Sequence, residues 1–114
     1  MEYTAQDYFN VEEALSRIRG DKNTLKLLIG LFVDSEEMTG LEKALAEQDY
    51  PSAAAFAHGI KGAAGNLSFT AMYNISSKLN EELKLGAPNE ETVAEYYAVL
   101  DGTRAAAQEA AAGL

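Results

Sequence analysis

The chain has no cysteine, a single histidine and only 2 prolines among its 114 residues. Without cysteine, disulfides, thiolate nucleophiles and thiolate metal ligands are all excluded. Basic residues are also scarce, because 9 Lys and Arg stand against 18 Asp and Glu, which gives a net charge of −9. A nucleic-acid binder needs a basic face and an anionic membrane attracts basic segments, so neither is expected as a partner.

Long hydrophobic runs and targeting signals are missing as well. The longest apolar stretch, residues 25–33, is interrupted by Lys26 and Gly30 and is too short to span a bilayer. The first residues lack the basic start and the apolar run of a signal peptide. We therefore expect a cytoplasmic protein. A length of 114 residues with 47% hydrophobic content predicts a single folded domain over residues 1–114.

The spacing of apolar residues predicts an all-α protein. Asn10, Asp21, Asp49 and Asn89 are expected N-caps, and Pro51 suits a first helical turn. The predicted helices are a short one over 11–18, a long one over 21–48, one ending near residue 66, one over 70–85, and one from residue 89 onward. Short loops favour antiparallel neighbours, so we predict an up-down antiparallel four-helix bundle with a short additional N-terminal helix.

The helix that carries the only histidine has an unusual surface. On a helical wheel of about 100° per residue, the predicted core residues lie opposite His58: Ala53, Phe56, Ile60, Ala63, Ala64 and Leu67. The residues on the His58 side are nearly all small, with one lysine: Pro51, Ala54, Ala55, Lys61, Gly62 and Gly65. Exposed helix faces normally carry long polar side chains. Glycines at 59, 62 and 65 each cost roughly 1 kcal/mol in a helix interior, so a compensating role is expected.

Clearance around the imidazole is the role that this pattern indicates. A side chain at position i+4 overlies residue i, and Gly62 removes that side chain above His58. Lys61 at i+3 brings an ammonium group beside the ring, which suits an anionic group on the imidazole. These features favour a nucleophile used by a macromolecule over a buried general base. The neighbours of His58 at i±3 and i±4 supply no further metal ligand, so no metal site is predicted.

Two alternatives stay open at this point. His58 could be an incidental surface histidine, and Gly59 on the flank could serve helix packing instead of clearance. A bundle that binds an apolar ligand is disfavoured by the full set of large core side chains.

The segment Ala57-His58-Gly59-Ile60-Lys61-Gly62-Ala63-Ala64-Gly65-Asn66-Leu67 resembles the signature of the histidine-containing phosphotransfer (Hpt) domain. That signature is His-x-aliphatic-Lys-Gly followed by small residues. The likeness extends over about residues 10–85, and the last helix is generic. Two departures lie beyond the signature and bear on the choice of partner. The family often has Gly-Ala where this chain has Ser68-Phe69, and a Glu is usual where it has Asn80.

The resemblance implies a function without catalytic machinery of its own. His58 would accept a phosphoryl group, through its outer ring nitrogen, from an aspartyl phosphate on a receiver domain and pass it to a second receiver Asp. Lys61 would neutralise phosphoryl charge, and Gly62 would give steric access. The receiver brings the Mg²⁺, so no cofactor and no ATP-dependent kinase activity are expected of this chain. The predicted partners are a response-regulator receiver domain and/or a hybrid histidine kinase, with the chain itself a monomer.

Docking of a receiver requires an apolar contact surface around His58. Ala54, Ala55 and Gly65 offer too little area for even a transient interface of about 1,000 Å². On the preceding helix, Ile29 and Val33 lie outside the predicted inward arc, and we expect them to extend the docking surface. The alternative is that they meet the short first helix or the flank of the bundle. A second class of function is a helical adaptor that docks a receiver or kinase domain through the His58 face without being phosphorylated.

Overall fold

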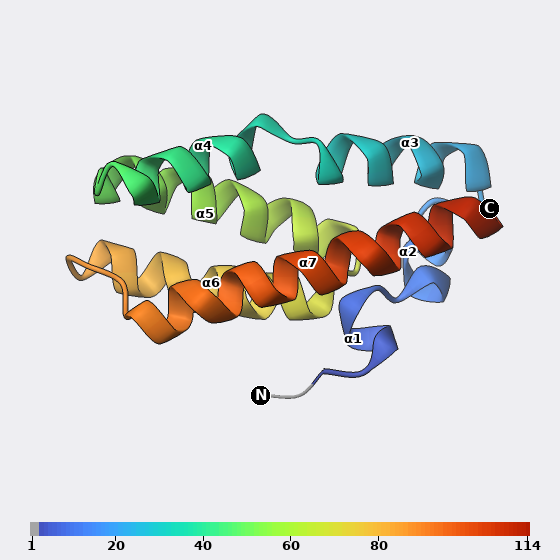
Figure 1. Ribbon diagram of the computed structural model, residues 1–114. Coiled ribbons are helices and arrows are strands. Elements are labelled where there is room, and N and C mark those ends of the chain that lie inside the picture. Colours follow the sequence, from blue (N-terminus) through green and yellow to red (C-terminus); the bar gives the residue numbers. More distant parts are fainter. Residues whose placement is uncertain (1–2) are drawn as a thin grey trace.

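The computed structural model describes residues 3–114, and this part of the chain is built of helices with no strand. The helices, shown in Figure 1, are α1 (Ala5–Tyr8), α2 (Val11–Arg17), α3 (Lys22–Val33), α4 (Glu36–Ala46), α5 (Tyr50–Asn66), α6 (Thr70–Lys84) and α7 (Glu90–Gly113). The prediction of an all-α protein is confirmed. No helix in the described range is long and apolar enough to cross a membrane.

Helices α4 to α7 pack against one another in chain order. α5 and α6 are antiparallel, because Asn80 of α6 bonds to Ala54 near the start of α5, whereas Tyr73 lies against Gly65 near its end. α3 extends away from α4 and contacts α7, and α1 and α2 lie at that same end of the molecule (Figure 1). α5 is therefore flanked by α4 on one side and by α6 on the other.

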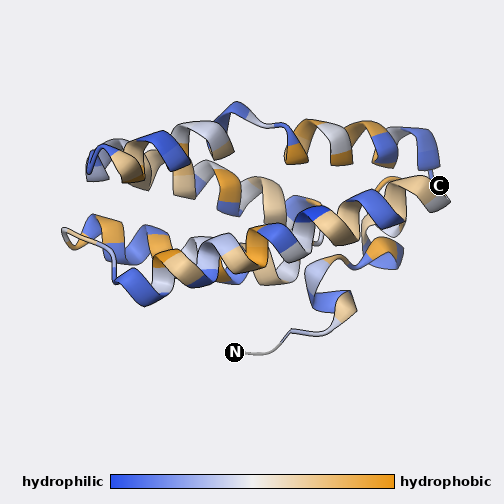
Figure 2. Cartoon of the chain, viewed as in Figure 1, coloured by the Kyte–Doolittle hydropathy of each residue, from blue (hydrophilic) through white to orange (hydrophobic). Residues whose placement is uncertain are grey.

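Stacked aromatic rings join the N-terminal segment to the rest of the core. The ring centroids of Phe9 and Phe69 are 4.4 Å apart, and those of Phe32 and Phe69 are 4.6 Å apart. Phe69, in the turn between α5 and α6, is fully buried between the other two rings. One of the two departures from the family pattern is thus a core residue. Apolar residues recur between polar ones along the helices, as expected for amphipathic helices that pack around a core (Figure 2).

The long helix predicted over 21–48 is two helices, so that prediction is wrong. α3 ends at Val33 and α4 begins at Glu36. Between them Ser35 is extended, and its side-chain oxygen accepts a hydrogen bond from the backbone N–H of Met38 at 3.4 Å. Serine is among the best N-caps, and the acidic first turn of α4 complements the helix dipole. The prediction joined the two helices because apolar residues recur every three or four positions on both sides of the break. The residues that the structure buries lie on nearly opposite sides of one continuous helical wheel: Leu25, Ile29 and Phe32 in α3, and Met38, Leu41 and Ala44 in α4.

The N-terminal segment holds two short helices where one was predicted. Thr4 and Asp7 form a reciprocal capping box for α1, with bonds of 3.0 and 3.2 Å. Asn10 caps α2 as expected, accepting from the backbone N–H of Glu13 at 3.1 Å. The carboxylate of Glu13 does not complete a capping box there. It bonds instead to Arg17 and Ser68.

The remaining boundaries lie close to the predicted ones. Asp21 and Asp49 cap α3 and α5 by accepting backbone N–H bonds of 3.1 and 3.3 Å. α6 covers Thr70–Lys84, one residue shorter than predicted. Asn89 occupies the N-cap position of α7, but its side chain makes no capping bond, contrary to the prediction. The backbone N–H of Asn89 donates to Glu82 Oε1 at 2.8 Å.

Candidate functional site

His58 lies in the middle of α5 with its side chain exposed. The buried stripe of this helix is Ala53, Ala57, Ile60 and Ala64, none of them more than 1% exposed. This stripe differs from the predicted one, because Phe56, Ala63 and Leu67 are only partly buried and Ala57 takes a place in it. The reason is that α5 packs closely against helices on two sides. Its small alanines allow α6 to approach closely, and the Phe56 ring packs over Gly40 of α4.

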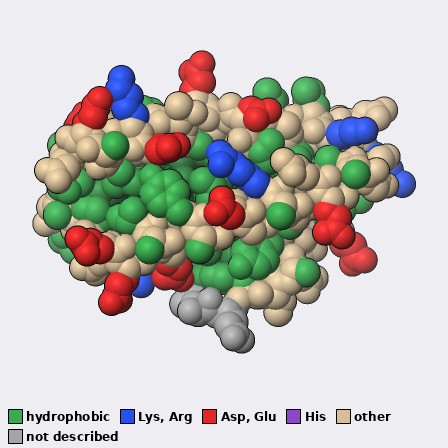
Figure 3. Space-filling model, viewed as in Figure 1, with side chains coloured by type: hydrophobic (Ala, Val, Ile, Leu, Met, Phe, Trp, Pro, Cys, Tyr) green, Lys and Arg blue, Asp and Glu red, His purple; other side chains and the backbone are tan. Residues whose placement is uncertain are grey.

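The exposed stripe of α5 is Pro51, Ala55, His58, Gly62 and Asn66. His58 is therefore bordered by small residues toward solvent, as the wheel predicts. The face of the molecule that α7 crosses shows no histidine side chain (Figure 3). The imidazole of His58 therefore lies on a different face of the molecule from α7 (Figure 3).

Three glycines near His58 have three different surroundings. A Cβ at Gly62 would meet no atom within 4 Å, so this position is open space beside the imidazole. A Cβ at Gly59 would meet the carboxylate of Glu37 from α4, the end of an exposed and flexible side chain that can move aside, so this contact does not by itself require glycine. A Cβ at Gly65 would stand 3.2 and 3.4 Å from ring atoms of Tyr73. Clearance is thus observed at Gly62, and close contact at the other two.

Lys61 leans toward α6. Its Nζ lies 5.8 Å from the centre of the Tyr73 ring, which is 40% exposed. Such a cation–π contact contributes about 0.5–1 kcal/mol at an exposed site. Sequence reasoning missed Tyr73, because only the register of α6 against α5 brings residue 73 to Lys61.

Asn80 contacts the histidine-bearing helix directly. It is 3% exposed, and its Nδ2 donates to the backbone carbonyl oxygen of Ala54 at 2.7 Å. Ala54 lies one turn before His58. Asn80 lies beyond the signature in the sequence, and the antiparallel return of α6 brings it back to the first half of α5.

Of the five predicted docking residues, only Ala55 is exposed, while Ala54, Gly65 and Val33 are partly buried and Ile29 is buried. Ile29 is 3% exposed and belongs to the core, and Val33 is partly buried against that core. The predicted place of Ile29 outside the inward arc is wrong, because α3 packs against α2 and α7 and its buried stripe is Leu25, Ile29 and Phe32. The exposed apolar side chains of α3 are Leu27 and Leu31, at 63% and 62%.

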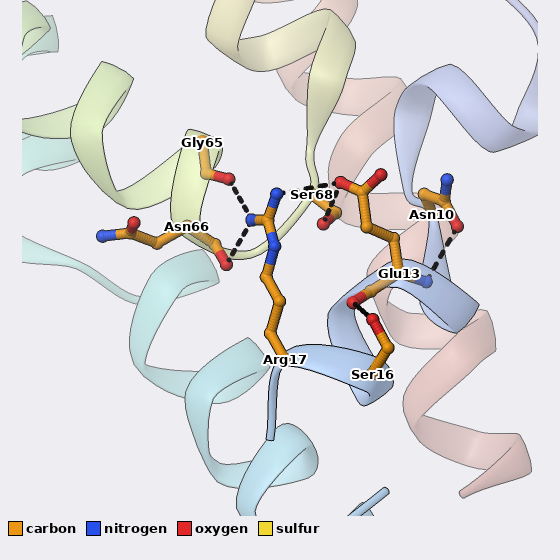
Figure 4. Close-up of polar contacts among 7 residues, drawn as sticks. All are labelled: Asn10, Glu13, Ser16, Arg17, Gly65, Asn66 and Ser68. Atoms are coloured by element: carbon orange, nitrogen blue, oxygen red, sulfur yellow. Dashed lines mark hydrogen bonds and ion pairs between the residues drawn. The ribbon is translucent and has the colours of Figure 1, made fainter. Parts of the chain in front are cut away.

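An arginine from α2 closes the C-terminal end of α5 (Figure 4). Arg17 Nη1 donates to the carbonyl oxygens of Gly65 at 2.6 Å and Asn66 at 3.0 Å. Its Nη2 bonds to Glu13 Oε1 at 3.1 Å, and Ser68 Oγ donates to the same oxygen at 2.8 Å. Helix C-termini leave carbonyl groups unpaired and carry partial negative charge, so a guanidinium is well placed there.

The same network explains why serine is tolerated at position 68. Ser68 has φ 64, a left-handed conformation that favours glycine, the residue that the family often has at this place.

We expect Ser68→Ala to lower the free energy of unfolding by about 1–2 kcal/mol, because it keeps the strained backbone and loses the bond to Glu13. Ser68→Gly should lose about 1 kcal/mol less, since glycine relieves that strain. Urea unfolding of both variants measures the difference, and an equal loss would show that the backbone strain is unimportant.

The electrostatic surroundings of the site are simple. No group of three or more His, Asp or Glu side chains that could hold a metal ion occurs in residues 3–114. Glu37 lies toward α4, beyond Gly59, and Lys61 lies toward α6. An anionic group placed on His58 would therefore have the ammonium on its α6 side and open space at Gly62.

Comparison with known families gives one match. The family model described as the Hpt domain matches residues 28–112. The chain belongs to the Hpt domain family. Hpt domains take part in phosphotransfer in phosphorelay signalling and interact with response-regulator receiver domains. The match begins in the middle of α3 and extends through nearly all of α7, although the resemblance found in the sequence did not reach this last helix. No curated protein and no solved structure matches the chain.

Proposed function

We propose that this Hpt domain is a phosphocarrier that accepts a phosphoryl group on His58 from an aspartyl phosphate of one receiver domain and passes it to the Asp of another. The observation that carries the proposal is the exposed imidazole beside the open space at Gly62, with Lys61 one turn further along α5. The test is incubation with a phosphorylated receiver domain, followed by mapping of the phosphoryl group. Binding without any label would favour an adaptor that docks a receiver through the same face.

The transfer step needs little from this chain beyond a positioned nucleophile. The lone pair of the outer ring nitrogen, Nε2, attacks phosphorus, and the bond from phosphorus to the aspartyl oxygen breaks with its electron pair staying on the carboxylate. Reacting atoms must first come within about 3 Å, in line. Lys61 offsets the added negative charge, and no ATP-dependent kinase step is required.

Docking is proposed on the exposed part of α5 and its borders. Ala55 is exposed on the His58 side of α5, and Ala54, Gly65 and Val33 are half-buried. Ile29 is left out because it is buried. We further propose that α4 to α7 form the up-down antiparallel four-helix bundle predicted from the sequence, and that the domain acts as a monomer.

Gly62→Gln should slow phosphotransfer from a receiver at least tenfold while the fold stays equally or more stable. Glutamine is a better helix former than glycine by roughly 0.5–1 kcal/mol, yet its side chain leans toward the N-terminus of α5, over His58. Rapid-quench kinetics with one receiver domain measures the effect. Gly62→Ala is the matched control, because its single methyl group meets open space. Unchanged transfer by the glutamine variant would show that clearance at Gly62 is not required.

A further inference from the structure

Lys61 lies between two possible partners along α5. His58 is one turn before it, and Gly65, against which the Tyr73 ring packs, is one turn after it. The Lys61 ammonium is 5.8 Å from the centre of that ring. The lysine that would serve a phosphoryl group on His58 therefore contacts the ring of Tyr73. That ring packs at Gly65, one turn beyond Lys61 and away from His58.

The other charged groups nearby do not compete for this ammonium. Glu13, which borders the pocket beside Tyr73, is bonded to Arg17 and Ser68. Glu37 lies on the opposite flank of α5, toward α4. The Tyr73 ring is thus the partner that the structure shows for Lys61.

We propose that Tyr73 is a positioning residue for Lys61. Its ring holds the ammonium away from His58 while the imidazole is free and releases it when His58 carries a phosphoryl group. This inference rests on the proposed phosphocarrier function. The exchange follows from charge: a phosphoryl group brings between one and two negative charges and three acceptor oxygens, whereas the ring offers only a quadrupole. Lys61 therefore has two positions, one for each state of the carrier.

The exchange has an energetic consequence for the phosphorylated state. Loss of the ring contact opposes phosphorylation by the strength of that contact. Removing the ring should therefore raise the share of phosphoryl held on His58 about two- to fivefold, which corresponds to a cation–π contact of roughly 0.5–1 kcal/mol at an exposed site. A role of Tyr73 in holding Lys61 ready beside His58 would change this share in the opposite direction.

The first measurement needs no phosphoryl transfer. The Lys61 side-chain methylene signals, assigned with Lys61→Arg, should be shifted upfield by the ring current in wild type and in Tyr73→Phe. In Tyr73→Leu they should move to ordinary values. Equal Lys61 signals in all three proteins would overturn the proposal. Circular dichroism and urea unfolding of the same proteins separate this effect from a general loss of structure.

The second measurement uses phosphoramidate, a small donor that needs no receiver. The imidazole lone pair attacks phosphorus, the phosphorus–nitrogen bond of the donor breaks, and ammonia leaves with its electron pair. On phosphorylation, the wild-type Lys61 signals should move toward those of Tyr73→Leu. Phosphorylated His58 with unmoved Lys61 signals would overturn the exchange alone. A wild-type protein that takes phosphoryl neither from phosphoramidate nor from a receiver would overturn the phosphocarrier function, and the exchange with it.

The third measurement is a competition. Wild type and Tyr73→Leu are mixed with one phosphorylated receiver, and intact-mass spectrometry gives the phosphorylated share of each at equilibrium. We expect the leucine variant to hold about two- to fivefold more phosphoryl relative to its free form, and Tyr73→Phe to match wild type. Equal shares, or a smaller share on the leucine variant, would contradict the proposal.

Discussion

His58→Gln is expected to abolish phosphoryl acceptance and to leave the fold intact. The side chain is exposed, so its replacement should change the free energy of unfolding by no more than about 0.5 kcal/mol. Glutamine keeps a polar side chain on the helix but has no nucleophilic ring nitrogen. The measurement is label transfer from a phosphorylated receiver domain, with urea unfolding of the same samples. Asn66→Gln is the matched control, because it changes another exposed residue of the same stripe and should transfer normally.

The chemistry of the label gives an independent check. His58 is the only histidine, so a phosphoramidate bond in the wild type can form on no other imidazole. The label should be lost in acid and retained in base. An acid-stable label, or equal labelling of wild type and His58→Gln, would place the phosphoryl group on another side chain and end the phosphocarrier proposal.

Local signals in the sequence were sufficient for most helix boundaries and for the exposed position of His58. Capping residues act within three positions of themselves, so Asp21 and Asp49 could be identified without any tertiary information. The helical wheel could place His58 and Gly62 on the solvent side, because both depend only on the periodicity of α5. The roles of these residues stay predictions until phosphorylation is measured.

Features that depend on how helices pack could not be obtained in this way. The break at Ser35 was missed because apolar residues recur every three or four positions on both sides of it, and only the packing shows that the buried faces of α3 and α4 are out of phase. Tyr73 and Asn80 reach α5 only through the register of α6, which has no local signature. The predicted location of Ile29 failed for a related reason: the inward arc of a helix is set by all its neighbours, and α3 has α2 and α7 as well as the remainder of the core.

The corrected location of Ile29 leads to the second large effect. Ile29→Ala should lower the free energy of unfolding by about 2–5 kcal/mol, because it removes a buried side chain and leaves a cavity. Ile29→Asp should lose more, since it also buries a carboxylate without a partner, and a domain of typical stability, about 5–15 kcal/mol, would lose a large part of it. Urea unfolding of the alanine variant gives the quantity even where the aspartate variant does not fold.

Leu27→Ala is the matched control on the same helix. Leu27 is 63% exposed against 3% for Ile29, so its truncation should cost no more than about 0.5 kcal/mol. Both substitutions introduce alanine two positions apart, so a difference larger than the few tenths of a kcal/mol by which leucine and isoleucine differ in helix propensity measures burial. Equal losses would mean that the inward face of α3 is not Leu25, Ile29 and Phe32. A stable Ile29→Asp variant with weakened receiver binding would instead restore Ile29 to the docking surface on which the sequence had placed it.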